Sequence, residues 1–433
     1  MNIWDPENEC LSPDALREIQ LARLRHTLEH AYWRVPHYRG TFDAAGVHPE
    51  KVKTLEDLAY FPFLRKADLR RNFPYGMLAV PMRDVVRIHS SSGTTGQATV
   101  VAYTRQDLEN WSELVARIVT AGGVGAGDIA QIAFGYGLFT GAFGLHYGLE
   151  KVGASVIPVS TGNTERQVAI MRDFGTTTLI CTPSYALHIA EVARESGVGR
   201  EQLKLRFGLF GAEAWSESMR KQIESELGIL ATDNYGLSEV MGPGVSGECE
   251  HRCGLHLNED HFLVEVIDPE TEMPVLEGET GELVITSLTK EALPVVRYRT
   301  GDLASIVREP CLCGRTSARM SRVKGRTDDM LIVRGVNVFP SQIEDILLEV
   351  EGTTPQYQIV LDRKGALDEM EIRVEVTEEI MTDEEPRLRA LESTIRKRLQ
   401  AALQVSPIVR LVEPRSIERS MGKAQRVVDK RVI

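Results

Sequence analysis

The stretch Ile88–Thr99, IHSSSGTTGQAT, combines a run of hydroxyl side chains with two glycines. Gly93 and Gly96 let the backbone turn so that several N–H groups converge on one concavity, to which the hydroxyls add donors. Such a concavity binds phosphate oxygens. It differs from the P-loop of nucleoside triphosphatases, because Gln97 stands where that pattern has lysine. For this stretch alone, a flexible polar linker is the alternative interpretation.

Four of the six cysteines lie in two short clusters, GECEHRCGLH and EPCLCGR. Zinc takes four nitrogen or sulfur ligands in a tetrahedron, usually as local pairs that the fold brings together. The pattern predicts a structural zinc site, and free thiols or an adventitiously oxidised pair are the alternative. The spacing leaves the ligand set open among Cys249, His251, Cys253, His256, Cys311 and Cys313.

Residues 128–235 contain the elements that must position these groups. DIAQIAF, ASVIPVS, TTLICT, LRFGLF and ILATDNY predict strands, and the stretches between them, such as PSYALHIAEVARES, predict helices. This alternation is typical of βαβ units around a parallel sheet. Ligands of such sheets bind beyond the carboxyl ends of the strands, so we expect the chemistry in the loops that follow them.

The rest of the chain has a different pattern. FLVEVID, GELVITS and LASIVRE, within residues 261–308, predict strands of an antiparallel β subdomain. Beyond GRTDD, a helix (SQIEDILLEV), two strands (QYQIVLD, EMEIRVEV), a long helix (EEPRLRALESTIRKRLQAAL) and a strand (IVRLV) follow. We therefore predict an α/β protein in which residues 1–327 form a large N-terminal domain, with parallel sheets and the β subdomain, and residues 328–433 form a small α+β domain.

The composition narrows the classes of function. The chain has 433 residues, a formal net charge of −12 and 42% apolar residues. This acidic balance argues against non-specific nucleic-acid binding, which uses basic surfaces to displace counterions. No apolar run reaches the ~18 residues of a membrane span, and the polar N-terminus MNIWDPENEC does not resemble a signal peptide. We expect a cytoplasmic protein that binds neither nucleic acid nor membranes.

Five segments in order, HSSSGTTGQAT, YGLSE, RYRTGDL, GRTDDMLIVRG and SMGKAQR, resemble the motifs of the adenylate-forming superfamily of acyl-CoA synthetases, luciferases and peptide-synthetase adenylation domains. Longer stretches, such as TSLTKEALPVVRYRTGDL and GRTDDMLIVRGVNVFPSQIE, resemble its phenylacetate–coenzyme A ligase branch. The resemblance extends over nearly the whole chain. It implies ATP- and Mg²⁺-dependent activation of an aryl carboxylic acid, phenylacetate preferred, through an acyl adenylate to its CoA thioester, with release of AMP and pyrophosphate.

Three other functions remain open. The chain could act on another arylacetate such as indoleacetate, because a shift of one pocket wall discriminates such acids by only a few kcal/mol. It could load a carrier-protein thiol instead of CoA. A non-catalytic nucleotide- or zinc-binding module is the least favoured, and Gln97 is the residue in its favour.

The resemblance assigns the polyphosphate to the hydroxyl-rich loop. Gln97 and Ala98 stand where the family usually has lysine and proline, so the loop brings amide donors without a charge, which Mg²⁺ is expected to offset. Glu239 is the expected Mg²⁺ ligand, with a helix cap as its alternative, and Ser238 keeps a hydroxyl near the α-phosphate. The expected phosphate-binding residues are Ser91, Ser92, Gly93, Thr94, Thr95 and Gly96.

The adenosine is expected beside the loop that follows Phe210. Tyr235 is expected to stack on adenine, Asp302 to accept hydrogen bonds from both ribose hydroxyls, and Arg326 to reach ribose or phosphate. On spacing alone, Asp302 would be an ordinary turn aspartate in TGD. With the pocket walls and one residue of the CoA tunnel, the expected cofactor-binding residues are Gly211, Ala212, Glu213, Asn234, Tyr235, Gly236, Asp302, Arg326 and Gly335.

The C-terminal domain is mobile in this family, with the position of Asp328 as its hinge. Lys423 is expected at the α-phosphate and the substrate carboxylate during the first half-reaction. Gly335, Val336 and Asn337 are expected to line the tunnel for the pantetheine arm. The alternatives are a polar linker at the hinge and an ordinary surface lysine.

Aromatic residues near the strand ends are expected to form the acid pocket, since flat rings suit an aryl acid; they could equally belong to the core. These residues are Tyr136, Phe139, Phe143, Gly211 and Pro243, with Gly244 completing the floor. For zinc, the resemblance selects Cys249, His256, Cys311 and Cys313, with Cys253 or His251 as a replacement for one of them. It also suggests a homodimer.

Overall fold

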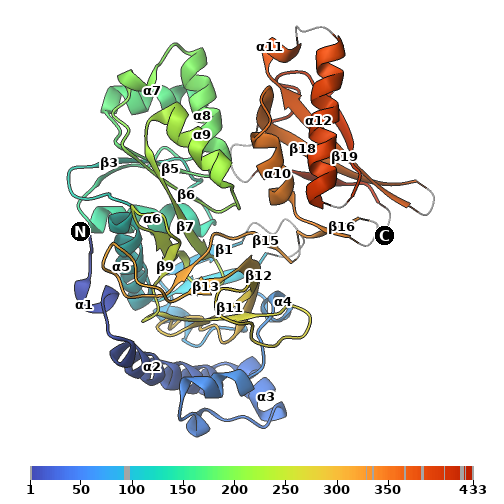
Figure 1. The fold of residues 1–433 in the computed structure, drawn as a ribbon. Coiled ribbons are helices and arrows are strands. Elements are labelled where there is room, and N and C mark those ends of the chain that lie inside the picture. The colour runs from blue at the N-terminus through green and yellow to red at the C-terminus, as the bar shows by residue number, and fades with distance from the viewer. Residues whose placement is uncertain are drawn as a thin grey trace.

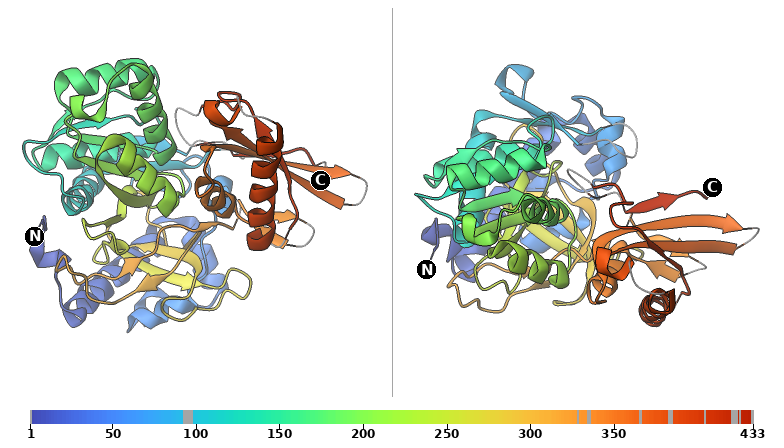
Figure 2. Two further views of the ribbon diagram at one scale, coloured as in Figure 1. Left: turned by 45° about the horizontal axis from the view of Figure 1, so that its top comes forward. Right: turned by 90° about the horizontal axis from the view of Figure 1, so that it is seen from above.

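The structure is a computed structural model that describes residues 2–91, 98–327, 329–333, 336–364, 367–381, 385–403, 405–419, 424 and 426–431. A larger N-terminal body is followed by a smaller C-terminal body, which lies to one side of it (Figure 1, Figure 2). None of the described helices is both long and apolar enough to cross a membrane.

The N-terminal segment wraps under the larger body as a series of helices (Figure 1). Ser12 caps the longest of them, because its Oγ accepts a hydrogen bond from the N–H of Ala15 and Pro13 occupies the first turn. In the sequence, Ser12-Pro13-Asp14 predicts this helix start, with a cap, a proline in the first turn and an acid on the helix dipole, and the structure confirms it. The helices are α1 (Pro6–Glu9), α2 (Pro13–Arg34), α3 (Pro36–Ala44) and α4 (Lys66–Arg71).

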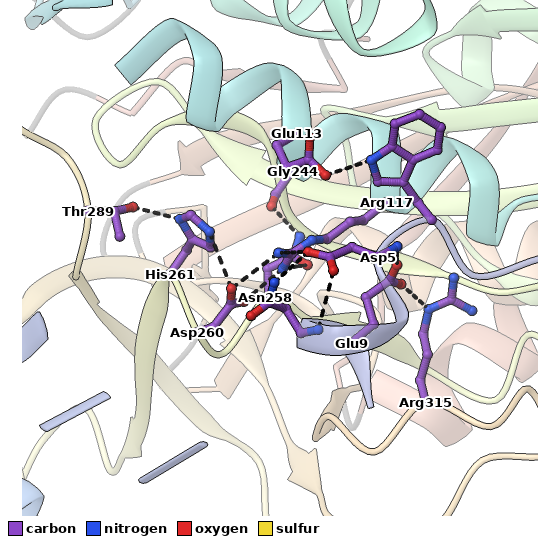
Figure 3. A network of polar contacts seen from close by, with 12 residues as sticks. Asp5, Glu9, Glu113, Arg117, Gly244, Asn258, Asp260, His261, Thr289 and Arg315 are labelled. Atoms are coloured by element: carbon purple, nitrogen blue, oxygen red, sulfur yellow. Dashed lines mark hydrogen bonds and ion pairs between the residues drawn. The ribbon is translucent and has the colours of Figure 1, made fainter. Parts of the chain in front are cut away.

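A buried network of charges fastens this segment to the larger body (Figure 3). Arg117 donates to Asp260 Oδ1 and Asp5 Oδ2, at 2.8 Å in each case. Glu9 forms a second buried ion pair with Arg315. Because a buried charge is stable only when it is paired, removing one partner of such a pair is strongly destabilising.

The larger body is built on a mixed sheet with the strand order β13-β14-β9-β8-β7-β6-β5-β3-β4. Strands β4, β3, β5, β6 and β7 are parallel, as predicted, and β8, β9, β14 and β13 continue the sheet in antiparallel pairs. The strands are β3 (Ile129–Ile132), β4 (Ser155–Ile157), β5 (Thr178–Cys181), β6 (Phe207–Gly211), β7 (Leu230–Leu237), β8 (Gly242–Glu248), β9 (Leu255–Leu257), β13 (Ile306–Val307) and β14 (Arg319–Met320).

Helices cover the sheet in two groups. Helices α5 and α6 pack against each other and against β8, whereas α7, α8 and α9 lie side by side. The larger hydrophobic cluster lies under the first group and a separate cluster lies under the second. These helices are α5 (Arg105–Ala121), α6 (Thr140–Lys151), α7 (Thr164–Phe174), α8 (Pro183–Glu195) and α9 (Glu217–Leu227).

The β subdomain is an antiparallel sheet of strands β10, β11, β12 and β15, in that order. The prediction of one strand over LASIVRE was wrong. Its first residues end β12, and the chain then changes sheet at Ser305, whose N–H donates to Ser321 Oγ at 3.0 Å, so that the following residues form β13. The strands of this sheet are β10 (Phe262–Ile267), β11 (Gly281–Ser287), β12 (Tyr298–Ala304) and β15 (Gly325–Arg326).

The C-terminal body has the α+β pattern that its sequence predicts. A hairpin of β16 and β17 precedes a sheet with the strand order β20-β19-β18-β21, against which α10 and α12 pack. Asp328 lies outside the described residues, and the domain boundary there stays a prediction. The elements are β16 (Leu331–Val333), β17 (Val336–Val338), α10 (Pro340–Leu348), β18 (Thr353–Lys364), β19 (Leu367–Val376), α11 (Glu378–Met381), α12 (Glu385–Leu403), β20 (Ile408–Val412) and β21 (Val427–Asp429).

Candidate active site

The hydroxyl-rich loop connects two antiparallel strands, β1 (Arg87–Ser90) and β2 (Val100–Tyr103). Ser91 closes the neck of this loop: its N–H donates to Thr99 O at 2.9 Å, and its Oγ accepts from Thr99 N at 3.0 Å. Five expected phosphate-binding residues and the unusual glutamine lie outside the described residues, namely Ser92, Gly93, Thr94, Thr95, Gly96 and Gln97. The structure thus defines where the loop begins and ends.

The ends of β6 and β7 form the second part of the site. Asn234 donates from Nδ2 to Phe210 O at 2.6 Å, and a Cβ at Gly211 would lie 2.4 Å from Asn234 O, so only glycine fits there. The next residue, Ala212, has φ +69°, a left-handed conformation that non-glycine residues rarely adopt. Such strain clusters at functional sites, and Glu213 is the next residue in the chain.

Tyr235, Asp302 and Arg326 form one hydrogen-bonded group. The buried Tyr235 hydroxyl donates to Asp302 Oδ2 at 2.7 Å, and Arg326 pairs with Asp302 Oδ1. Burial, followed by the charge of Asp302, holds the pKa of Tyr235 well above its usual value. Asp302 keeps further acceptor capacity for hydroxyl donors, because each carboxylate oxygen has two lone pairs. The two residues expected to bind the ribose thus lie together beside the expected adenine-stacking tyrosine.

Ser238 and Glu239 lie in the turn between β7 and β8, at the carboxyl end of the parallel strands. A strand follows this turn, so the alternative of Glu239 as a helix cap is wrong. Ser238 Oγ is 2.9 Å from Thr140 Oγ1. The buried carboxylate of Glu239 is 4.0 Å from Lys66 Nζ, at the start of α4.

Two lysines that the sequence analysis missed bring positive charge to this turn. Lys66 carries no motif that would single it out. Lys290 is buried, with Nζ 4.5 Å from the centroid of the Tyr103 ring. Burial lowers the pKa of Lys290 to about 8, against the opposing effect of Asp107 and Glu239. The neutral Gln97 therefore does not leave the site without cationic residues.

The three aromatic residues expected in the acid pocket lie after β3 and in the first turn of α6, whereas Gly211 ends β6 and Pro243 lies in β8. The rings of Tyr136 and Phe143 pack edge to face with centroids 5.2 Å apart. Phe139 immediately precedes α6 and is 38% exposed. Pro243 O accepts a hydrogen bond from Trp111 Nε1 at 2.7 Å, which fixes the start of β8 beneath this group. Thr140 contacts Ser238 and directly follows Phe139, so the aromatic residues adjoin the turn that contains Ser238 and Glu239.

The cysteine clusters meet where β9 pairs with β14. Cys249 Sγ and Cys311 Sγ are 3.8 Å apart, and Cys313 Sγ is 3.3 Å from His256 Nε2. A tetrahedral zinc ion with Zn–S of about 2.3 Å would separate two sulfurs by about 3.8 Å. His256 Nδ1 lies 3.2 Å from Ser317 Oγ, an outer partner of the kind that orients a ligating ring. The donor set fits zinc.

The ligand set favoured by the resemblance is also the compact one. The ligand atoms of Cys249, His256, Cys311 and Cys313 all lie within 4.8 Å of one another. Cys253 is exposed, with its Sγ 3.4 Å from Cys311 Sγ, and is the nearest substitute.

The remaining predicted site residues belong to the C-terminal body. Asp328, Gly335 and Lys423 lie outside the described residues. Val336 begins β17. The residue after Lys423 is described: the N–H of Ala424 donates to Glu213 Oε2 at 3.1 Å.

Comparisons with known proteins agree with this arrangement. The family model of AMP-binding enzymes matches residues 38–289, and the model of the AMP-binding enzyme C-terminal domain matches residues 335–431. Phenylacetate-coenzyme A ligase of Thermus thermophilus is 48% identical over 99% of this chain and 100% of its own. Phenylacetate-coenzyme A ligase of Escherichia coli is 49% identical over 98% of this chain and 97% of its own.

Solved structures of 2-hydroxyisobutyryl-CoA ligase have the same fold. In the postadenylation state with R3-HIB-AMP, that enzyme gives a TM-score of 0.94 at 29% identity, over 100% of this chain and 93% of its own. In the thioesterification state with 2-HIB-AMP and CoA, the TM-score is 0.74 at 30% identity, over 99% of this chain and 92% of its own.

Proposed function

We propose that this chain, which belongs to the phenylacetate–coenzyme A ligase family of AMP-forming enzymes, has phenylacetate as its acid substrate. Enzymes of this family activate a carboxylic acid with ATP and transfer the acyl group to CoA. The observation that carries the choice is the aromatic group of Tyr136, Phe139 and Phe143 beside the Ser238–Glu239 turn. A planar aryl ring fits between aromatic side chains better than a branched aliphatic acid does.

In the first half-reaction, a carboxylate oxygen attacks the α-phosphorus and the bond to the pyrophosphate oxygen breaks. Negative charge then shifts onto the leaving pyrophosphate, so the site needs donors and cations placed in advance. We assign the donors to the hydroxyl-rich loop and Ser238, and the cations to Lys423 and Lys66. Asp302 and Arg326 hold the ribose.

Glu239 would hold Mg²⁺ through its buried carboxylate, since a hard ion prefers oxygen ligands. When bound, the ion offsets charge on the polyphosphate.

In the second half-reaction, the CoA sulfur attacks the carbonyl carbon of the adenylate and AMP leaves. We propose that the C-terminal body rotates about Asp328 between the two steps, which brings residues 335–337 to the pantetheine arm. The lower similarity to the thioesterification state of 2-hydroxyisobutyryl-CoA ligase supports this proposal.

Zinc has a structural role in this proposal. Cys249, His256, Cys311 and Cys313 would complete its coordination, which leaves no open position for substrate. The ion would join the loop after β8 to the loop between β13 and β14, away from the adenylation chemistry.

A pyrophosphate-release assay with a panel of acids, with and without CoA, tests the proposal. We expect phenylacetate to give the highest kcat/KM and indoleacetate a lower value. A preference for indoleacetate would make this acid the substrate. If the acyl product forms only when a carrier protein is added, the carrier-protein thiol and not CoA would be the acceptor. Lys423→Ala should lose adenylate formation and still make thioester from preformed adenylate. Equal loss of both half-reactions would contradict the role of Lys423.

A further inference from the structure

The side chain of Glu213 joins two parts of the molecule that are distant in sequence. Its Oε1 accepts from the N–H of Ser184 at 2.7 Å, and its Oε2 accepts from the N–H of Ala424 at 3.1 Å. Ser184 lies in the first turn of α8, where the backbone N–H groups have no partner within the helix. Glu213 therefore satisfies a free donor of the N-terminal body and holds a segment of the C-terminal body with the same carboxylate.

The backbone beneath Glu213 is fixed. Gly211 pairs with Asn234 in the sheet and has no room for a Cβ. Ala212 is held at φ +69°, a conformation that persists only when its surroundings enforce it. The backbone therefore fixes where the Glu213 side chain starts, and its two hydrogen bonds fix where the carboxylate lies.

The segment that Glu213 holds is the one that carries Lys423. Ala424 directly follows that lysine in the chain, so a hydrogen bond to the N–H of Ala424 limits where residue 423 can lie. The expected role of Glu213 was a wall of the adenine pocket. That role stays a prediction, and the side chain of Glu213 points to α8 and to the C-terminal segment.

Ion pairs beside a cavity also join the two bodies. Arg419 donates to Glu191 of α8 at 3.1 Å and to Glu375 of β19 at 2.7 Å, and Arg415 pairs with Glu195. The cavity is lined by α8 and α9 on one side and by residues 353–356 on the other. Polar contacts of this kind between domains permit relative motion.

We infer that Glu213 is a positioning residue for the first half-reaction: its carboxylate anchors the segment after Lys423 to helix α8, and this anchor is released before thioester formation. The inference rests on the role proposed for Lys423. Rotation of the C-terminal body separates Ala424 from Glu213, so the contact serves one half-reaction and has no part in the other.

Glu213→Gln is the test, because glutamine has the same shape but only one acceptor oxygen for two N–H donors. Adenylate formation is measured in a single turnover as pyrophosphate release, and thioester formation is measured from preformed phenylacetyl adenylate and CoA. We expect the first rate to fall about tenfold to hundredfold, the effect of one hydrogen bond to a charged group, and the second rate to stay within about twofold. The matched control is Glu201→Gln, an exposed carboxylate of the same body.

Thioester formation is also the folding control, because a damaged protein would lose both rates. Equal loss of both rates would show a merely structural role and overturn the inference, as would an unchanged rate of adenylate formation. These outcomes are distinguishable from a failure of the proposed function, in which the unmodified protein would release no pyrophosphate with any aryl acid.

Discussion

Protonation of His261 should cost this protein stability between pH 6.5 and pH 4. His261 follows Asp260 in the buried charge network (Figure 3), with Nδ1 2.7 Å from Thr289 Oγ1 and Nε2 3.3 Å from Asp260 Oδ2. Burial lowers its pKa from 6.5 to about 4, although Asp260 opposes this effect; Arg117 and Arg23 reinforce it. The imidazole is therefore neutral in the folded protein at pH values where it is charged in the unfolded chain.

The sign and size follow from proton linkage. A group whose pKa is lower in the folded state binds its proton more readily when unfolded, so the stability that His261 contributes falls as the pH falls below 6.5 and levels off near pH 4. The difference of about 2.5 between the two pKa values corresponds to about 3 kcal/mol in total, and about 2 kcal/mol of this is lost by pH 5. The pKa of Asp260 is lowered from 3.8, so Asp260 stays charged across this window.

Urea unfolding at pH 7, 6 and 5 measures the loss. The buried carboxyls of Asp233 and Glu344 have pKa values raised to about 8 and about 7, so they favour the folded state as the pH falls and oppose the effect of His261. The contribution of His261 is therefore measured as a difference: from pH 7 to pH 5 we expect the change in free energy of unfolding to be about 2 kcal/mol less favourable in the unmodified protein than in His261→Gln. His26→Gln, at an exposed position of α2, should keep the dependence of the unmodified protein. Equal slopes for the unmodified protein and His261→Gln would refute the reasoning.

Three further substitutions probe the metal, the ribose site and the acid pocket. Cys313→Ser should remove bound zinc, measured by elemental analysis, and lower the melting temperature. The control Cys181→Ser changes a buried cysteine outside the cluster and should keep the metal. An unchanged zinc content in Cys313→Ser would exclude the site. Asp302→Asn should raise the KM for ATP about tenfold to hundredfold and also weaken the binding of preformed adenylate, because both molecules carry the ribose; an unaltered KM would remove Asp302 from the ribose site. Phe139→Ala should weaken binding of phenylacetate about tenfold, measured as KM, and favour bulkier acids; an unchanged order of acids would show that Phe139 does not shape the pocket.

The sequence predicts what depends on neighbours along the chain. The βαβ pattern, the cap at Ser12 and the cysteine pairs are local signals, and the structure confirms the strands, the helix start and the closeness of the cysteines. The break between β12 and β13 was missed because it depends on Ser321, which follows β14 and is distant from Ser305 in sequence. Lys66 at Glu239 and Ala424 at Glu213 were missed for the same reason, since nothing near either residue in the sequence indicates its partner.

The fastened N-terminal segment provides a natural optical reference for domain motion. Trp4 donates from Nε1 to Glu113 at 2.6 Å, and its neighbour Asp5 is bonded to Arg117. With the other tryptophans replaced, Trp4 can serve as the donor for energy transfer to an acceptor dye on an exposed residue of α12. Because Trp4 is fixed to the larger body, a change in transfer would report movement of the C-terminal body alone. Turnover could then be watched as a change of distance, without any label on the nucleotide or the acid.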